Sequence, residues 1–218
     1  MNVAVMGYGT VGSGVVEIIN TKHSYIKERT SEEDLEVKYI LDLRDFPGDP
    51  NEGKFTKDFN DILNDDSVKI VAEAMGGVNP AFDFTAKCLA AGKHVVTANK
   101  ALVAAHGPEL AALARENGVA LLFSAACGGG VPFLHNLALA AQTDRVTEVG
   151  GILNGTTNYI LDKMTSEGLP YEEVLKAADQ LNWNGVKVFT ADHFKVALQT
   201  LKSKDEPFRE DQKSGGVI

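Results

Sequence analysis

Cysteines, long apolar stretches and basic clusters are all scarce in this sequence. Its 218 residues include two cysteines, Cys88 and Cys127, which are too few for a disulfide framework and form no Cys-x-x-Cys pair for structural zinc. No apolar run approaches the roughly 20 residues that span a bilayer, and no basic signal region precedes the first apolar stretch. A cytoplasmic protein that does not contact a membrane is therefore expected.

Positive charge is scarce as well. The chain has 21 Lys and Arg against 30 Asp and Glu, a formal net charge of −9, and no run rich in Lys or Arg. Nucleic-acid binders normally carry the opposite sign or a basic patch, so we expect no nucleic-acid partner. An anionic cofactor would have to be held by local backbone donors, because the overall field repels it. None of the five histidines has Asp, Glu or Cys at ligand spacing, which argues against a transition-metal site.

Strand and helix patterns alternate over the first 125 or so residues. Strands are expected at 2–6, 37–43, 69–75, 94–98 and 119–125, and helices at 10–20, 80–91 and 106–117. Asn79 and Pro80 are expected as the N-cap and first residue of the second of these helices. This alternation predicts an α/β fold, a Rossmann-type doubly wound parallel sheet.

The pattern changes at Gly-Gly-Gly-Val-Pro-Phe (128–133), which cannot continue a regular strand. A helix at 134–142, a strand at 146–153 and helices at 156–166 and 171–181 are expected after it. We therefore predict a dinucleotide-binding domain over 1–127, a second, smaller α+β substrate lobe over 128–202, and a polar tail over 203–218.

Gly7, Gly9 and Gly12 form a Gly-x-Gly-x-x-Gly motif between the first strand and the first helix. In such a motif the first glycine permits a tight turn, the second lets the backbone approach a pyrophosphate, and the third allows close helix–strand packing. The helix N-terminus adds free N–H donors. The strand–turn–helix context favours dinucleotide binding over a glycine turn without a ligand.

Asp42 occupies the place at the end of the second strand where such units carry an acidic residue. It lies further from Gly7 than the usual spacing of about 20 residues, and the polar insertion at 21–34 accounts for the excess. Asp42 could accept from an adenosine ribose, which favours NAD, whereas Arg44 could hold a 2′-phosphate, which favours NADP. Asp42 is also explained as a loop cap, so the sequence leaves the choice of cofactor open.

Gly76 and Gly77, and the segment 97–100, each follow an expected strand. The carboxyl ends of parallel strands border the ligand crevice, so both segments are expected to face it. Lys100 there could contact a substrate or the nicotinamide end, or it could be a surface lysine that begins a helix. The glycines at 128–130 fit close approach to a ligand or ion, and equally a hinge. Asn154–Asn158 fits a helix start with free N–H groups or simple capping.

Longer segments resemble the homoserine dehydrogenase family, and the similarity extends from residue 1 to about 183. The matching segments are GYGTVGSGVV (7–16), EAMGG (73–77), VVTANKALVA (95–104), GGGVPF (128–133), GILNGTTNYIL (151–161) and EGLPYEEVLKAADQL (167–181). The resemblance implies interconversion of L-aspartate 4-semialdehyde and L-homoserine by hydride transfer with NADP or NAD, a step of threonine and methionine biosynthesis.

The same resemblance implies roles for individual residues. The glycine motif with Thr10 and Val11 would cradle the cofactor, Lys100 would lie between cofactor and substrate, and Gly155 and Thr156 would belong to the wall of the active site. A sodium ion would be held by main-chain carbonyls, which here belong to Ser124, Cys127, Gly129 and Val131. Position 124 departs from the family, which usually has Glu there. A homodimer formed through the second lobe is also implied.

The C-terminal region departs further from the family pattern. Gly185 stands where a substrate-binding Glu is expected, and the family's Asp-x-x-x-Lys helix is missing at its usual place. Asp192 and Lys195 are one residue too close to replace it, although Lys195 is the best substitute proton donor. Three hypotheses follow: a homoserine dehydrogenase, a shortened cofactor-binding relative without catalysis, or a dehydrogenase for another small aldehyde or amino acid.

Overall fold

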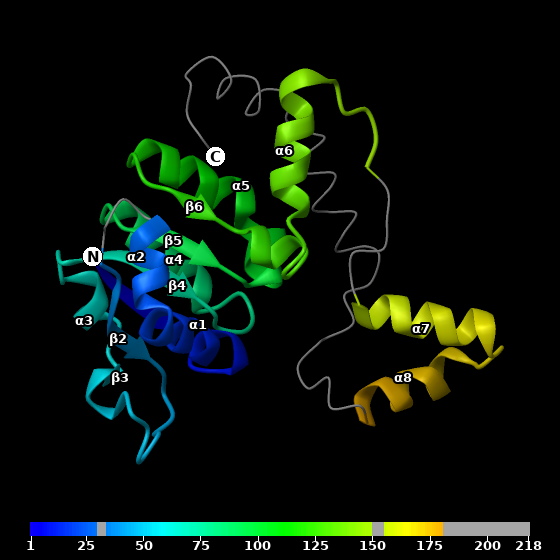
Figure 1. Ribbon diagram of the computed structural model, residues 1–218, viewed down its shortest axis with the longest axis horizontal. Helices are drawn as coiled ribbons and strands as arrows, with labels where there is room; N and C mark the ends of the chain where they lie inside the picture. Colours follow the sequence, from blue (N-terminus) through cyan, green and yellow to red (C-terminus); the bar gives the residue numbers. More distant parts are fainter. Residues whose placement is uncertain (30–33, 150–154, 181–218) are drawn as a thin grey trace. The chain divides into compact units, whose positions relative to one another are not determined.

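The computed structural model describes residues 1–29, 34–149 and 155–180, which divide into two compact units. The first unit comprises Met1–Gly129, and the second begins at Gly130. The first unit contains a six-stranded sheet flanked by helices (Figure 1). No helix in the described part of the chain is both long and apolar enough to cross a membrane.

Every strand pair in the sheet is parallel. The strands are β1 (Asn2–Met6), β2 (Glu36–Leu41), β3 (Phe55–Thr56), β4 (Val68–Glu73), β5 (His94–Thr97) and β6 (Leu121–Leu122). Their order, β3-β2-β1-β4-β5-β6, is that of a doubly wound Rossmann sheet, so the predicted fold class is confirmed. The order reverses between β1 and β4, and ligands of such sheets bind beyond the carboxyl ends of the strands at this point.

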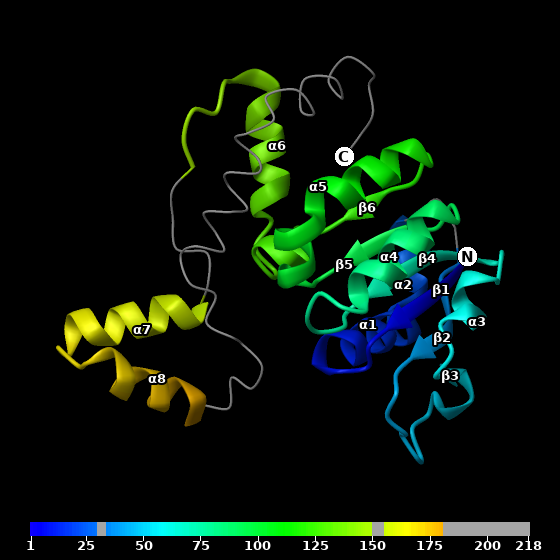
Figure 2. The same cartoon turned by 180° about the vertical axis from the view of Figure 1, so that it is seen from behind.

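Helices cover both faces of the sheet. Successive side chains of β1 point to opposite faces, and each set packs into the hydrophobic core on its own face. Val3 and Val5 pack with α1 (Thr10–Thr21), whereas Ala4 and Met6 belong to the core beneath the helices on the other face. Those helices are α3 (Asn60–Leu63), α4 (Ala81–Ala90) and α5 (Lys100–Glu116), and Figure 2 shows α4 and α5 from behind. Three short elements complete the unit: α2 (His23–Arg29), η1 (Glu52–Lys54) and η2 (Ser124–Cys127).

Several predicted boundaries were wrong. The helix expected at 106–117 begins at Lys100, because the Asn99 side chain caps it by accepting a hydrogen bond from Leu102 N. Pro80, rather than Asn79, is the N-cap of α4, and no side chain caps that helix. The strand expected at 119–125 is limited to Leu121–Leu122, because the chain turns into η2 at Ser124.

The described part of the second unit contains three helices, α6 (Phe133–Thr143), α7 (Gly155–Ser166) and α8 (Tyr171–Gln180). Helices α7 and α8 pack together through the buried side chains of Ile160 and Val174. The strand predicted at 146–153 is wrong over 146–149, which form no regular element, and its remaining residues lie outside the described part. Positions 181–218, including the predicted last residue of the final helix, Lys195 and the predicted polar tail, also lie outside it.

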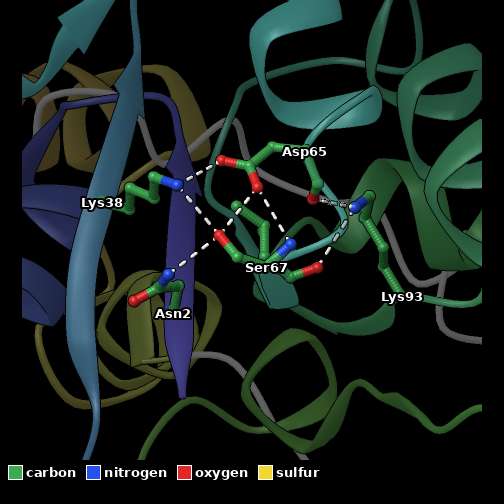
Figure 3. Close-up of polar contacts among 6 residues, drawn as sticks. Asn2, Lys38, Asp65, Ser67 and Lys93 are labelled. Atoms are coloured by element: carbon green, nitrogen blue, oxygen red, sulfur yellow. Dashed lines mark hydrogen bonds and ion pairs between the residues drawn. The ribbon is translucent and has the colours of Figure 1, made fainter.

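A polar network joins the strands at their amino ends (Figure 3). Lys38 on β2 pairs with Asp65 at 2.5 Å and donates to the Ser67 hydroxyl at 2.9 Å, and Asn2 on β1 donates to the same hydroxyl at 2.9 Å. The Lys93 side chain is 2% exposed, and its ammonium donates to the carbonyl oxygens of Asp65 and Val68 at 2.7 and 3.1 Å. We call these residues the amino-edge network.

Candidate functional site

The turn between β1 and α1 needs two of its glycines for its own geometry. Gly7 has a φ of +92°, a conformation that side chains with a Cβ rarely adopt. A Cβ on Gly12 would lie 1.8 Å from the Gly7 carbonyl oxygen. The predicted close packing at Gly12 is therefore a contact between the first turn of α1 and the glycine turn that precedes it.

Gly9 differs, because nothing in the protein's own packing requires a glycine there. A Cβ at Gly9 would meet no atom within 4 Å, and its φ of −88° is open to other residues. Gly9 is the N-cap of α1, which has no side-chain cap and no acidic residue in its first turn. Thr10 and Val11, the first residues of the helix, are exposed. The free N–H groups of a helix start and its positive dipole end suit an anion such as a pyrophosphate.

Asp42 and Arg44 lie beside this turn and bind each other. The Arg44 side chain donates from Nε to Asp42 Oδ1 at 3.0 Å and from Nη2 to Oδ2 at 2.9 Å. The backbone N–H groups of Tyr8 and Arg44 donate to the same carboxylate at 2.8 and 3.0 Å. These hydrogen bonds, chiefly those from the Arg44 side chain, hold the pKa of Asp42 well below its usual range.

An aromatic cluster fixes the loop that follows Arg44 to the glycine turn. Tyr8 packs edge-to-face on Phe46 and Phe55 with ring centroids 5.0 and 4.9 Å apart, and its hydroxyl donates to Asp49 Oδ2 at 3.0 Å. The Arg44 guanidinium lies 5.1 Å from the centroid of the Phe46 ring. Burial and the Asp49 carboxylate raise the pKa of the Tyr8 hydroxyl. The cluster therefore orients Arg44 at the carboxyl end of β2.

A buried carboxylate that the sequence analysis missed lies at the carboxyl end of β4. Glu73 is 1% exposed and accepts hydrogen bonds from Met75 N at 2.8 Å, Asn99 Nδ2 at 3.3 Å and the Thr97 hydroxyl. Asn99 Nδ2 also donates to the Gly77 carbonyl at 2.6 Å. A charged residue directly after the apolar run 70–72 was the available signal. Gly76 and Gly77 thus follow β4 at the same edge as the glycine turn.

Lys100 is the first residue of α5 and lies directly after this network. Its side chain is exposed, and no described residue forms an ion pair with it. Burial raises the pKa of the Cys127 thiol, and the positive charge of Lys100 acts in the opposite direction. Lys100 therefore lies near enough to η2 for its charge to act there, and it is available to a ligand at the carboxyl edge.

The predicted sodium ligands are divided between the two units. Ser124 and Cys127 are the first and last residues of η2, and Gly129 follows with a φ of +60°. Val131 belongs to the second unit, and its carbonyl accepts a hydrogen bond from Phe133 N at 2.7 Å. The sodium site at these four carbonyls stays a prediction. Among residues 1–29, 34–149 and 155–180, no group of three His, Cys, Asp or Glu side chains could hold a metal ion.

The predicted cofactor residues of the first unit, in contrast, follow neighbouring strands. The glycine turn follows β1, Asp42 and Arg44 follow β2, Gly76 and Gly77 follow β4, and Lys100 follows β5. Gly155 begins α7 in the second unit. This edge of the sheet can hold a long anionic ligand, because it combines an uncapped helix start with an exposed arginine and an exposed lysine.

Known proteins that resemble the chain include homoserine dehydrogenases. A family model described as "Homoserine dehydrogenase, NAD binding domain" matches residues 7–124, and one described as "Homoserine dehydrogenase" matches residues 132–184. The homoserine dehydrogenase of Bacillus subtilis (strain 168) is 41% identical over 192 residues, which cover 84% of this chain and 43% of that protein. The chain thus spans less than half the length of that relative.

Solved structures agree with these sequence matches. A homoserine dehydrogenase from Thiobacillus denitrificans aligns with a TM-score of 0.76 at 33% identity, covering 86% of this chain and 44% of that one. A hyperthermophilic archaeal homoserine dehydrogenase in complex with NADPH shares the fold, with a TM-score of 0.74 at 22% identity, covering 92% and 68%. Since the NAD-binding family model alone matches more than half of the sequence, the chain belongs to the homoserine dehydrogenase family.

Proposed function

We propose that the chain binds a nicotinamide dinucleotide and interconverts L-aspartate 4-semialdehyde and L-homoserine. The observation that carries the proposal is the open position of Gly9 at the uncapped start of α1, where the strand order of the sheet reverses. Because the chain spans 43% of its B. subtilis relative, the activity and its place in threonine and methionine biosynthesis are proposals for this chain.

The residues of the first unit fit such a cofactor. The N–H groups at the start of α1, from Thr10 and Val11, would hold the pyrophosphate in the space beside Gly9. The Asp42–Arg44 pair would meet the adenosine end, and the Gly76–Gly77 turn with Lys100 would border the nicotinamide end. This assignment follows the order β2, β1, β4, β5 along the edge of the sheet.

A bound cofactor would supply or accept the hydride at C4 of its nicotinamide. The chain itself has to orient the substrate and move a proton at the substrate oxygen as charge develops there. Lys100 is the candidate donor in the described residues, because it is exposed at this edge and unpaired there. Lys195 is the second candidate and lies outside the described residues. Gly155 begins α7 in the second unit, and its place in the active site stays a prediction.

NADP is the cofactor that the Asp42–Arg44 geometry favours. The Asp42 carboxylate already accepts four hydrogen bonds from Tyr8 and Arg44, which leaves little acceptor capacity for a ribose diol. The Arg44 side chain is 61% exposed, so its guanidinium is accessible to a 2′-phosphate. The archaeal homoserine dehydrogenase of the same fold was solved in complex with NADPH.

The first experiment is NADP-linked and NAD-linked oxidation of L-homoserine by the purified chain, with Lys100→Ala as the comparison. Turnover that is lost in the variant supports the enzyme and the role of Lys100. Saturable NADPH binding without turnover supports the second candidate, a cofactor-binding relative without catalysis, which is favoured by Gly185 in place of the family's substrate-binding Glu. A chain that binds neither cofactor contradicts both. A panel of other small aldehydes and amino acids separates homoserine from a different substrate.

Cofactor preference has its own test. Arg44→Ala is expected to lower the affinity for NADPH by about tenfold and to leave that for NADH unchanged, because a charge-assisted contact to the 2′-phosphate is lost. Lys69→Ala removes an exposed charge on β4 and serves as the control. Equal losses for both cofactors in Arg44→Ala would contradict the NADP preference. A sodium ion at Ser124, Cys127, Gly129 and Val131, a homodimer and a cytoplasmic location stay predictions.

A further inference from the structure

Glu73, Thr97 and Asn99 form a buried network with the Gly77 carbonyl, which we call the carboxyl-edge clasp. The three side chains are 1%, 1% and 6% exposed. Glu73 and Thr97 are register partners on β4 and β5, and Asn99 is the N-cap of α5. The clasp therefore joins three structural features that meet at one edge: the turn after β4, the end of β5, and the start of α5.

Each hydrogen bond of the clasp has a defined direction. Asn99 Oδ1 accepts from Leu102 N at 3.1 Å, which fixes the amide so that Nδ2 donates to both Glu73 and Gly77. The Thr97 hydroxyl accepts from Asn99 N at 3.0 Å and donates to Glu73. Every partner of Glu73 is thus a donor, as an ionised carboxylate requires.

Burying Glu73 in the clasp lowers the stability of the fold, which argues against a purely structural role. Among the described residues no Lys, Arg or His forms an ion pair with Glu73, and burial raises the pKa of its carboxyl group. Burying an unpaired charge lowers stability unless several hydrogen bonds offset it, and an apolar residue would complete the strand without that cost. Two of the clasp's hydrogen bonds hold the backbone of Met75 and Gly77 in the turn, and a third joins Glu73 to Thr97 on β5.

We propose that Glu73 and Asn99 are positioning residues that hold the Gly76–Gly77 turn against the start of α5 and so fix that turn and Lys100 for the nicotinamide half of the cofactor. This inference rests on the proposed function. It assigns the clasp to one half of the ligand, because the glycine turn and Arg44, which would hold the other half, share no hydrogen bond with it in the described residues.

Three variants separate positioning from folding. Glu73→Ala removes all three acceptor contacts. Glu73→Gln keeps an oxygen that can accept from Met75 and Asn99 and loses only the acceptor for Thr97. Asn99→Ser keeps a hydroxyl able to cap α5, since serine is as good an N-cap as asparagine, but it cannot bridge to Glu73 and Gly77.

The measurement compares two ligands of the unmodified chain and of each variant. NADPH contains both halves of the cofactor, whereas 2′,5′-ADP contains only the adenosine half. Glu73→Ala and Asn99→Ser are expected to weaken NADPH binding by about tenfold, since a hydrogen-bonded support is lost, and to reduce the fluorescence enhancement of the bound nicotinamide. Affinity for 2′,5′-ADP should stay within about twofold, and Glu73→Gln should restore most of the NADPH affinity.

Parallel losses for NADPH and 2′,5′-ADP would overturn the proposal, because they indicate a general structural role. Unchanged NADPH affinity and nicotinamide emission in Glu73→Ala and Asn99→Ser would overturn it as well. If the unmodified chain binds neither compound, the proposed function itself has failed. That outcome is distinct from a chain that binds both compounds and is indifferent to the clasp.

Discussion

Lys93 at the amino edge of the sheet is buried against two carbonyl oxygens, whereas Lys100 at the carboxyl edge is exposed and has no ion-pair partner in the described residues. The same contrast holds for the groups around them. The amino-edge network connects Asn2, Lys38 and Ser67 to one another or to Asp65. The carboxyl edge leaves the start of α1 uncapped and open space beside Gly9.

This difference distinguishes polar residues that stabilise the fold from polar residues that are free to bind a ligand. A network whose donors and acceptors are matched stabilises the protein alone. Donors without protein partners at a helix start need water or an anion. Substitutions at the amino edge should therefore change stability and not cofactor binding, and selected substitutions at the carboxyl edge should do the reverse.

The largest effect is expected for Gly12→Ala, the exception at the carboxyl edge. Its Cβ would lie 1.8 Å from the Gly7 carbonyl oxygen, so the turn has to move, and we expect a loss of about 3 kcal/mol in the free energy of unfolding. Gly14→Ala in the same helix meets no atom within 4 Å and should raise stability by about 0.5–1 kcal/mol. Urea denaturation measures both, and equal stability of the two variants would refute the packing argument.

Lys93→Met tests the amino edge. The change removes the donor for the carbonyls of Asp65 and Val68, and we expect a loss of about 2 kcal/mol in the free energy of unfolding. NADPH affinity should stay the same, because the network lies at the opposite edge. The control is Lys69→Met, which removes an exposed lysine from β4 and should change stability by less than about 0.5 kcal/mol. Weaker NADPH binding by Lys93→Met would contradict the conclusion that the amino edge contributes to stability and not to cofactor binding.

Gly9→Ala should show the reverse pattern. Because a Cβ there meets nothing within 4 Å, the free energy of unfolding should fall by no more than about 1 kcal/mol, the cost of alanine at an N-cap. The methyl group occupies the space assigned to the pyrophosphate, so NADPH affinity should fall by about tenfold, which is about 1.4 kcal/mol. Titration of NADPH fluorescence and urea denaturation supply the two numbers. If Gly9→Ala binds NADPH as tightly as the unmodified chain, the pyrophosphate does not lie beside Gly9.

Two carboxylates at the carboxyl edge should respond to pH in opposite directions. Burial raises the pKa of Glu73 above its ordinary value of 4.5, so the folded chain keeps a proton that the unfolded chain has released. Stability relative to Glu73→Gln should therefore fall as pH rises from 4.5 through the raised pKa.

Asp42 provides the comparison for this profile. Its pKa is lowered from 3.8, so its contribution is present above that pH and is lost as pH falls further. Stability relative to Asp42→Asn should therefore fall on acidification, the opposite of the Glu73 profile. Urea midpoints between about pH 3 and 8 measure both differences, and profiles of the same sign would contradict the assignment.

The smallest effect on stability is expected for Thr85 in α4, which belongs to neither edge network. Its hydroxyl is fully buried and has no hydrogen-bond partner among the described residues. Thr85→Val replaces that hydroxyl with a methyl group of similar size, and stability should stay the same or rise by about 1 kcal/mol. A clear loss of stability in urea denaturation would reveal a partner for the hydroxyl.

The sequence predicted five of the six strands, because each of the five contains a cluster of apolar residues, and it missed the two-residue strand β3. It did not predict the start of α5. The weakly amphipathic segment from Lys100 to Ala105 precedes Gly107 and Pro108, and a proline inside a helix removes a backbone hydrogen bond. The Asn99 cap, tied to Glu73 on another strand, starts the helix at Lys100. Such a tertiary contact leaves no periodic pattern in the sequence.

The candidate site was predictable to the same extent. The glycine motif and the positions of Asp42, Arg44 and Lys100 followed from the rule that ligands lie beyond the carboxyl ends of parallel strands. The pairing of Asp42 with Arg44 did not follow, because two residues that are close in sequence can point apart or together. The carboxyl-edge clasp needs the register of β4 and β5, which the sequence alone does not supply.

Strand β1 lies in the middle of the sheet, although both of its neighbours follow it in the chain. Asn2 pairs with Glu36 on one side and with Val68 on the other. During synthesis β1 can therefore form its backbone hydrogen bonds only after β2 and β4 have been made. Pairing between segments so distant in the chain slows folding. Until β4 emerges, the strand that is most enclosed in the finished sheet is an exposed edge, and edges of this kind are where nascent chains aggregate or recruit chaperones.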